Sequence, residues 1–420
     1  MKRFIVLLLA VLLFASSAGC GEVINEKNAS AESPADSTAA SYVEQSAPES
    51  EAAVSGSESE AEEPKPDGRE LFTLEPVGEV IDIHTEEQAA FLNGPYDEIG
   101  KYTDGKHEYS KPKGAVISWS FHREKLPETY GKPDAFRVLC DTDPGFSDPL
   151  VVSRFSGSPE RYSAAVRNLF LDAFYYCKVQ AIYGDEVFES ETFSFRTAAT
   201  APRNLDIEGV SNVRDIGGRM IDETHRIKQG LIYRGAAFED LNYKTHITPR
   251  GITQAREELG VRSEIELRWI SVGEIESQSG SLLGDDINYY EFEFNYIDEV
   301  LLTGNHKSIA KCFELFADSD KYPIYYHCRI GTDRTGVLTY LLLGFLGVDK
   351  DRILTDYLFS NFGYVGGNRS VETIQKAYID LIDSYRGADL QEKITNYLKE
   401  ECGVKTATLE KIRRNLIEEI

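Results

Sequence analysis

The spacing of apolar residues changes along this 420-residue chain. Residues 4–14 form an uninterrupted apolar run, whereas residues 22–69 contain almost no large apolar side chain. From residue 70 to about 200, apolar and polar residues alternate in short runs, which predicts strands with one buried side. Later in the chain, the apolar run 324–326 is followed by helical spacing, which is typical of a buried parallel strand and its helix.

The alternating region predicts an all-β sandwich over residues 70–200, because turn residues separate its short strands. Cys140 and Cys177 lie on two of these strands, and the sequence leaves open whether they form a disulfide. The segments 174–181 and 191–197 resemble the last two strands of a fibronectin type III domain. Such a module is either a spacer or a ligand-binding unit. The expected strands are 116–121, 135–140, 150–155, 174–183 and 192–196.

The first 20 residues predict an export signal. Lys2 and Arg3 precede the apolar run, which would span about 17 Å as a helix, well short of the ~30 Å hydrocarbon core. The sequence then ends in small residues and Cys20, which resembles a bacterial lipobox with Cys20 as the lipidated residue. Residues 21–69 predict a disordered acidic tether. We therefore expect a lipid-anchored, extracytoplasmic protein, with plain secretion or an uncleaved anchor as the alternatives.

The net charge of −25, without any basic block, argues against nucleic acid as a partner and against binding to anionic lipid surfaces. Chemistry on phosphate would then need a locally positive pocket. The charge pattern therefore directs attention to single motifs in the C-terminal half.

The segment from Tyr322 to Gly336 predicts such a pocket, because a strand, a glycine-containing turn and a helix follow one another there. A helix N-terminus binds anions through its free backbone N–H groups. It also stabilises the thiolate, the form in which a cysteine is nucleophilic. Cys328 stands at this position, and Arg334 offers a planar fork for two phosphate oxygens. The Thr335 hydroxyl can assist departure of the thiolate.

The sequence His327-Cys328, five residues, Arg334-Thr335-Gly336 resembles the signature loop of cysteine-dependent tyrosine and dual-specificity phosphatases. We call residues 328–334 the signature loop. The resemblance extends over segments 207–218, 231–236 and 265–268, and it implies that residues 201–420 form the catalytic domain. It also implies that His327, Cys328, Arg334 and Thr335 are catalytic. The residues expected to bind the phosphate are Arg329, Ile330, Gly331, Thr332, Asp333 and Arg334.

The general acid has two candidates. In most of the superfamily an Asp about 30 residues before the cysteine protonates the leaving group, and Asp298 matches that position. In the atypical bacterial subfamily an Asp inside the loop takes this role, and Asp333 matches it. That subfamily usually has Lys where this chain has Thr332, which weakens the case for multiply phosphorylated substrates. Arg214, Asp215 and Arg234 are interpreted as members of ion pairs within the fold.

We expect a multidomain protein: an N-terminal all-β sandwich and a C-terminal α/β phosphatase domain with a central, mostly parallel sheet flanked by helices. Its substrate would be a phosphorylated protein or peptide, phosphotyrosine first, or a phosphorylated lipid or inositol. A surface protein that only binds phosphate is the alternative from another class. No metal or organic cofactor is implied. The remaining helices are expected at 351–362, 370–385, 389–401 and 407–418.

Overall fold

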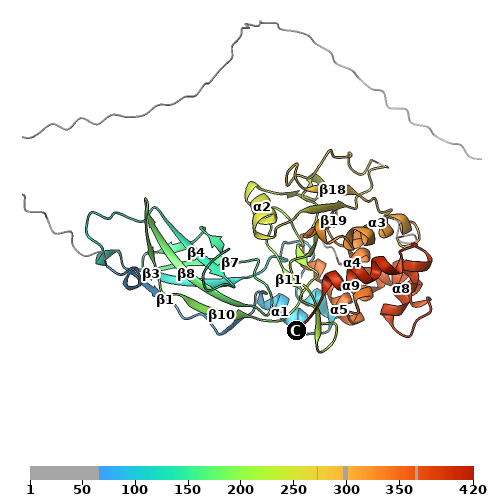
Figure 1. The fold of residues 1–420 in the computed structure, drawn as a ribbon, viewed down its shortest axis with the longest axis horizontal. Helices are drawn as coiled ribbons and strands as arrows, with labels where there is room; N and C mark the ends of the chain where they lie inside the picture. The colour runs from blue at the N-terminus through green and yellow to red at the C-terminus, as the bar shows by residue number, and fades with distance from the viewer. Residues whose placement is uncertain (1–65, 272, 297–300, 365–367) are drawn as a thin grey trace, which may run out of the picture. The chain divides into compact units, whose positions relative to one another are not determined.

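The computed structural model describes residues 66–271, 273–296, 301–364 and 368–420 (Figure 1). The predicted export signal, Cys20 and nearly all of the predicted tether lie outside the described residues, and so does Asp298. Within the described part of the chain, no helix has the length and apolar character needed to span a bilayer.

Two sheets with a common hydrophobic core make up most of residues 72–197. Ile117, Val138 and Val179 come from different strands and are all buried in this core. Burial alternates along the strand at residues 174–183, so the alternation in its sequence reflects one buried side. The first sheet has the order β1 (Phe72–Leu74), β3 (Ala115–Phe121), β7 (Arg161–Val166) and β6 (Ser156–Ser158). The second has the order β2 (Val80–Ile81), β10 (Phe193–Thr197), β8 (Phe174–Tyr183), β4 (Ala135–Asp141) and β5 (Leu150–Val152), with β9 (Glu186–Glu189) paired to β8.

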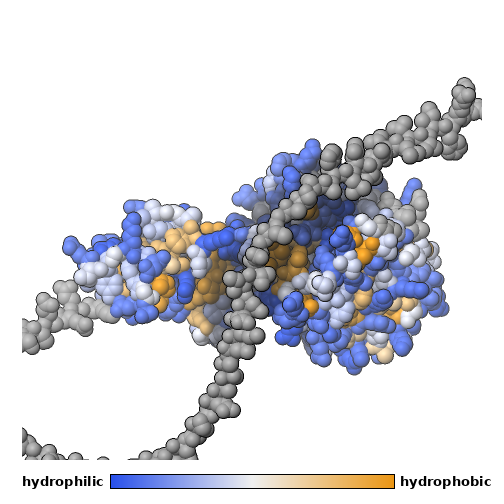
Figure 2. All heavy atoms as spheres, turned by 90° about the horizontal axis from the view of Figure 1, so that it is seen from above, coloured by the Kyte–Doolittle hydropathy of each residue, from blue (hydrophilic) through white to orange (hydrophobic). Residues whose placement is uncertain are grey.

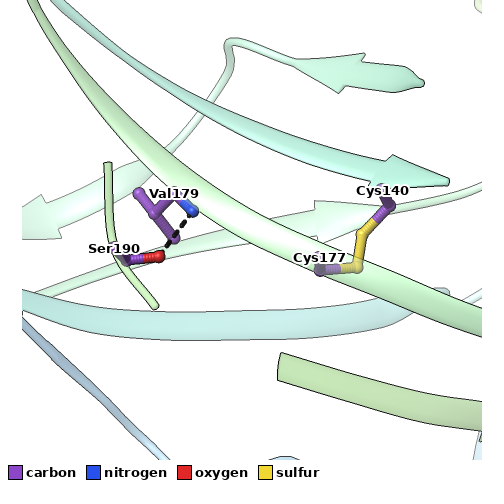
Figure 3. Close-up of a disulfide and its surroundings, with 4 residues drawn as sticks. All are labelled: Cys140, Cys177, Val179 and Ser190. Carbon is purple, nitrogen blue, oxygen red and sulfur yellow. Dashed lines mark hydrogen bonds between the residues drawn. A yellow bond between two sulfur atoms is a disulfide. The ribbon is translucent and has the colours of Figure 1, made fainter. Parts of the chain in front are cut away.

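The structure answers the question that the sequence left open about two cysteines. Cys140 of β4 and Cys177 of β8 lie directly opposite each other in the antiparallel pair and form a disulfide (Figure 3). Both residues are buried in the core between the sheets. Many hydrophobic side chains of these sheets remain on the surface (Figure 2), among them Val80, Val151 and Phe174.

A helical insertion between β2 and β3 was not expected from the alternating pattern. It contains α1 (Glu86–Leu92) and a 3-10 helix, η2 (Tyr96–Lys101). A capping box starts α1: the Thr85 hydroxyl accepts from the Gln88 N–H at 3.2 Å, and the Gln88 side chain accepts from the Thr85 N–H at 3.1 Å. The ring of Phe91 on α1 packs against Phe359 and Phe362, so the insertion contributes to the core of the C-terminal half.

A six-stranded, mostly parallel sheet forms the centre of the C-terminal half. Its four adjacent strands β14, β19, β17 and β18 run parallel, whereas β12 and β11 are added antiparallel at one edge. All residues of β19 are buried, which explains its continuous apolar and aromatic sequence. The order is β11 (Arg203–Asn204), β12 (Arg214–Asp215), β14 (Ile232–Ala236), β19 (Ile324–Cys328), β17 (Ser263–Glu266) and β18 (Asn288–Glu291). Short pairs join β13 (His225–Ile227) to β20 (Ile417–Glu419) and β15 (Glu239–Asp240) to β16 (Thr245–His246).

Helices pack around this sheet, and α4 (Asp333–Leu346) is buried along its entire length. The predicted helical stretches are confirmed with small differences at their ends. The last one stops at Leu416, where the chain enters β20. The other helices are α2 (Pro249–Thr253), α3 (His306–Phe316), α5 (Lys350–Phe359), α6 (Val371–Ile374), α7 (Asp380–Asp383), α8 (Leu390–Glu400) and α9 (Thr406–Leu416).

Candidate active site

The signature loop connects the central strand β19 to the buried helix α4. Cys328 is the last residue of β19, is 2% exposed, and lies opposite Ala236 of the neighbouring strand β14. Gly331 has a φ of +71°, and a Cβ there would lie 2.3 Å from the backbone of Gly235. Only glycine fits this turn, because the left-handed backbone and the contact with β14 both exclude a side chain.

Hydrogen bonds hold the backbone carbonyls of residues 329–331 from outside the loop. The carbonyl of residue 329 accepts from the Ala237 N–H at 3.2 Å. The Asn212 side-chain amide donates to the carbonyls of residues 330 and 331 at 3.1 Å each, and Arg234 donates to that of residue 331 at 2.6 Å. Because trans peptide units are planar, the N–H groups of residues 330–332 point away from these donors.

The N–H groups of residues 329–332 have no hydrogen-bond acceptor among the described residues. Thr332, the N-cap of α4, also makes no side-chain capping bond. The start of α4 therefore presents a row of free donors immediately after Cys328, with the helix dipole behind them. This arrangement binds an anion such as phosphate.

Glu274 fixes the guanidinium of Arg334. Its carboxylate accepts from both terminal nitrogens of Arg334, at 2.5 and 2.7 Å, and also from the Trp269 N–H at 2.8 Å. Burial raises the pKa of Glu274, but the hydrogen bonds and charge of Arg334 outweigh burial and lower it. The ring of Tyr296 lies 5.2 Å from the same guanidinium. Arg334 is thus held in one orientation before any substrate binds.

Two side-chain donors in the first turn of α4 have no hydrogen-bond partner in the described part of the chain. They are Nε of Arg334 and the hydroxyl of Thr335, and both atoms are buried. Buried donors without acceptors are rare in folded proteins and occur often at functional sites. Both residues were predicted to be catalytic, and the structure places them in the first turn of α4.

Asp333 lies in an ion pair with a residue that the motif does not include. Arg369 donates to both oxygens of Asp333, at 2.9 Å each. The hydroxyls of Tyr296 and Tyr357 also donate to Asp333, at 3.1 and 3.3 Å, and burial raises the pKa of Tyr357 so that this phenol keeps its proton. As arranged here, Asp333 accepts hydrogen bonds instead of offering a proton.

His327 and Arg329 also have acidic partners. His327 is buried, and its Nε2 lies 2.7 Å from the Glu264 carboxylate. Arg329 donates through Nε to Asp240 at 2.8 Å. The contact with Glu264 therefore fixes the orientation of the buried His327 side chain, whereas Arg329 is a partly exposed residue whose charge is already balanced.

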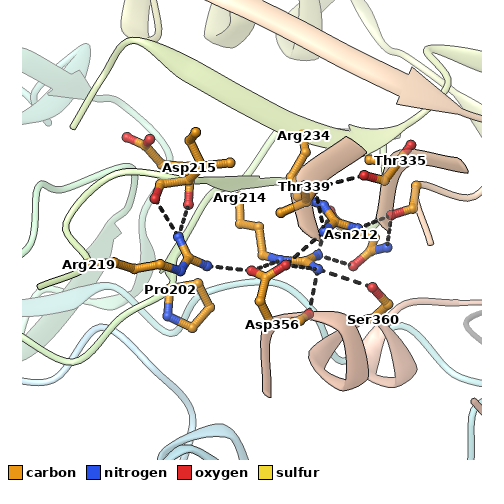
Figure 4. A network of polar contacts seen from close by, with 12 residues as sticks. Pro202, Asn212, Arg214, Asp215, Arg219, Arg234, Thr335, Thr339, Asp356 and Ser360 are labelled. Carbon is orange, nitrogen blue, oxygen red and sulfur yellow. Dashed lines mark hydrogen bonds and ion pairs between the residues drawn. The ribbon is translucent and has the colours of Figure 1, made fainter. Parts of the chain in front are cut away.

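A buried charge cluster around Asp356 contacts the signature loop through Arg234 (Figure 4). Asp356 of α5 accepts from Arg214 at 2.9 Å, from Arg234 at 2.7 Å, and from Arg219. Burial raises the pKa of Asp356, but the three guanidinium groups hold it well below its ordinary range. Burial and the neighbouring Arg234 lower the pKa of Arg214 to about 10. One carboxylate faces three guanidinium groups, so this cluster carries an excess of positive charge within a negative protein.

The sequence reasoning missed several residues that complete this site. Asn212 lies in the segment 207–218, which was interpreted only as family resemblance, and Glu274 follows the segment 265–268, which was interpreted in the same way. Asp356 and Arg369 follow the signature loop, and no local pattern marks them. In the described ranges, no cluster of three or more His, Cys, Asp or Glu side chains is suited to a metal ion.

Comparison with known proteins identifies the class to which this fold and site belong. The profile of the tyrosine phosphatase family matches residues 205–418, just over half of the chain, so the protein belongs to the tyrosine phosphatase family. A Cupriavidus necator protein named “Putative tyrosine-protein phosphatase” is 24% identical over 249 residues, which cover 49% of this chain and 86% of that protein.

Among the solved structures that resemble the chain are two of the same yeast enzyme. The core catalytic domain of the PP-IP phosphatase Siw14 from S. cerevisiae, in complex with citrate, is 16% identical with a TM-score of 0.27 and covers 40% of this chain and 91% of its own. A second structure of the Siw14 catalytic core is 15% identical with a TM-score of 0.28 and covers 40% and 90%. Similarity this low adds nothing to the argument about substrates.

Proposed function

We propose that this protein hydrolyses phosphate monoesters, phosphotyrosine first among them, through a phosphocysteine intermediate on Cys328. Membership of the tyrosine phosphatase family supports phosphatase activity. The observation that best supports the cysteine mechanism is the loop itself. Its carbonyls are held from outside, its N–H groups have no acceptor among the described residues, and Cys328 lies at its start.

The proposed reaction has two displacements. The Cys328 thiolate attacks phosphorus, an S–P bond forms, and the P–O bond to the leaving group breaks. The loop N–H groups and Arg334 stabilise the charge on the phosphoryl oxygens. Water then attacks phosphorus, the S–P bond breaks, and the Thr335 hydroxyl stabilises the departing thiolate. Two easier steps replace one difficult step.

The leaving group needs a proton in the first displacement, and both acid candidates stay open. Asp333 can donate only after its ion pair with Arg369 opens and the carboxylate gains a proton. Asp298 lies outside the described residues and stays a prediction from its spacing. The pH profiles of kcat/KM for Asp298→Asn and Asp333→Asn can decide which residue is the acid.

The charges around the loop support a singly phosphorylated substrate. Each of the three arginines at its rim already has a carboxylate partner: Arg329 with Asp240, Arg334 with Glu274, and Arg369 with Asp333. A polyphosphorylated inositol would need additional free cations. The exposed ring of Tyr296 next to Arg334 is suited to contact an aromatic leaving group.

The remaining predictions concern the rest of the chain. We propose that the two-sheet region is a fibronectin type III-like module, a proposal that its common core and antiparallel strand pairs support. We also propose that lipid on Cys20 and the acidic tether hold the enzyme outside the cytoplasm at the membrane. The disulfide between Cys140 and Cys177 supports an oxidising compartment.

Phosphate release from a substrate panel tests this function. Phosphotyrosine peptides, phosphoserine peptides, phosphoinositides and phytate would be compared, with wild type and Cys328→Ser side by side. We expect turnover of phosphotyrosine that the substitution abolishes. Preference for phosphoinositides or phytate would contradict the proposed substrate but keep the mechanism. No turnover under reducing conditions would favour a protein that only binds phosphate.

A further inference from the structure

Residues 103–111, which we call the brace, precede β3 and lie outside the region that the family profile matches. The brace nevertheless contacts the catalytic half at several points. The Lys111 ammonium donates to the carbonyls of Ile207 and Val210 at 2.6 and 2.8 Å. The Tyr109 N–H donates to the Phe362 carbonyl at 2.6 Å. The brace is therefore attached both to residues 207–210, before β12, and to Phe362, after α5.

Ser110 is the buried centre of the brace, with 2% of its surface exposed. Its hydroxyl accepts from the Asn212 N–H at 2.9 Å and donates to the Glu108 carboxylate. The other oxygen of Glu108 accepts from the Tyr364 N–H at 3.0 Å. Ser110 thus has a defined donor and a defined acceptor, and its hydroxyl can adopt only one orientation.

Asn212 transmits this contact to the loop. Its φ of +61° is left-handed, which costs energy for any residue other than glycine and requires support from its surroundings. Its side-chain oxygen accepts from Arg214 at 2.5 Å, while its amide nitrogen donates to the carbonyls of residues 330 and 331. Ser110 therefore fixes the backbone of Asn212, whose side chain donates to both of these carbonyls.

A second route leads from the brace to Asp333. The Thr103 hydroxyl donates to the Asn361 carbonyl at 2.8 Å. The Asn361 side chain makes two hydrogen bonds with the backbone of Arg369: its oxygen accepts from the N–H at 2.9 Å, and its nitrogen donates to the carbonyl at 3.0 Å. Arg369 in turn forms the ion pair with Asp333. The brace is therefore connected to the signature loop at two places: at the turn through Asn212, and at the start of α4 through Arg369.

We propose that Ser110 is a positioning residue of the phosphatase site, with Asn212 as its intermediary. By fixing Asn212, it keeps the loop carbonyls turned outward and the loop N–H groups turned toward the phosphate. The inference rests on the proposed phosphatase function. It implies that the family-matched region alone is an incomplete catalytic unit, because part of the support of its loop comes from the N-terminal half.

The test compares Ser110→Ala, Ser110→Thr and Ser190→Ala in the full chain. Thr keeps the hydroxyl. Ser190 is the matched control: it is also buried, and its hydroxyl accepts from the Val179 N–H at 2.9 Å in the two-sheet region (Figure 3). The readouts are kcat/KM for an aryl phosphate, the inhibition constant of orthovanadate, and the thermal midpoint.

We expect Ser110→Ala to weaken orthovanadate inhibition and to lower kcat/KM, each by about tenfold, which corresponds to ~1.4 kcal/mol. Ser110→Thr should restore both values to within about threefold, since it keeps the hydrogen bond. Ser190→Ala should lower the thermal midpoint similarly but leave both constants unchanged. A Ser110→Ala enzyme with wild-type constants and a lowered midpoint would overturn the proposal.

If Ser110→Ala does not fold, Glu108→Ala provides the decision, because it removes the carboxylate that accepts from the Ser110 hydroxyl. Weaker orthovanadate inhibition would then support the positioning role of Ser110, and unchanged inhibition would overturn it. The two failures can be told apart. A wild-type enzyme without turnover or vanadate binding refutes the phosphatase function itself, whereas an active wild type with unaffected variants refutes only the role of the brace.

Discussion

The contact between Glu274 and Arg334 yields a quantitative prediction. Glu274→Gln keeps the shape of the side chain but removes its charge and one of its two acceptors for the guanidinium, which lie at 2.5 and 2.7 Å. A hydrogen bond to a charged group contributes roughly 1.5–3 kcal/mol. Losing one such bond corresponds to about a 10- to 150-fold change in a rate constant. We therefore expect kcat/KM to fall by that factor.

The fall should appear mainly in kcat, because Arg334 interacts most strongly with the charge that develops in the transition state. Steady-state kinetics with an aryl phosphate would measure it, and thermal unfolding would confirm that the variant is folded. Asp286→Asn is the matched control, since Asp286 makes a similar two-nitrogen contact with Arg256 at 2.7 and 3.0 Å. A folded Glu274→Gln enzyme whose kcat/KM stays within threefold of wild type would refute the reasoning.

Three further predictions follow from the charges and thiols. Asp356→Asn leaves three buried guanidinium groups without their carboxylate and should cost about 3–5 kcal/mol at pH 7 in urea unfolding. Because the folded pKa of Asp356 is lowered, its stabilisation is present above its unfolded pKa of ~3.9, so the gap to wild type should shrink as pH falls below about 4. A stability difference between wild type and Asp356→Asn that stays constant with pH would contradict this reasoning. Of Asp298→Asn and Asp333→Asn, the variant of the true acid should lose the high-pH limb of the kcat/KM profile, and two unchanged profiles would reject both candidates. Iodoacetate at pH 6 should alkylate Cys328 and spare Cys402, because burial raises the pKa of Cys402 to about 12. Mass spectrometry of the peptides would measure both, and alkylation of Cys402 without alkylation of Cys328 would contradict the prediction.

The local parts of the site could be predicted from the sequence because neighbouring residues determine them. The apolar run before Cys328, the glycine turn and the helical spacing after Arg334 correspond to β19, the signature loop and α4. The interpretation of Arg214, Asp215 and Arg234 as members of buried ion pairs is also confirmed.

The supporting contacts could not be predicted, because they join residues that only the complete fold brings together. Arg214 and Asp356 are 142 positions apart, and Ser110 and Asn212 are 102 apart. No periodicity in one segment reports such a pair. Helix α1 was missed for a different reason: it is only seven residues long within a strand-rich region, and the Thr85–Gln88 capping box was its main local sign.

Trapping the covalent intermediate tests the central claim most directly. Wild-type enzyme would be mixed with a ³²P-labelled phosphotyrosine peptide and quenched in acid within milliseconds, and the labelled peptide would be identified by mass spectrometry. We predict phosphate on Cys328, absent in Cys328→Ser and increased in Thr335→Ala, whose intermediate should hydrolyse more slowly. Turnover without any label on Cys328, or turnover that survives Cys328→Ser, would contradict the phosphocysteine mechanism.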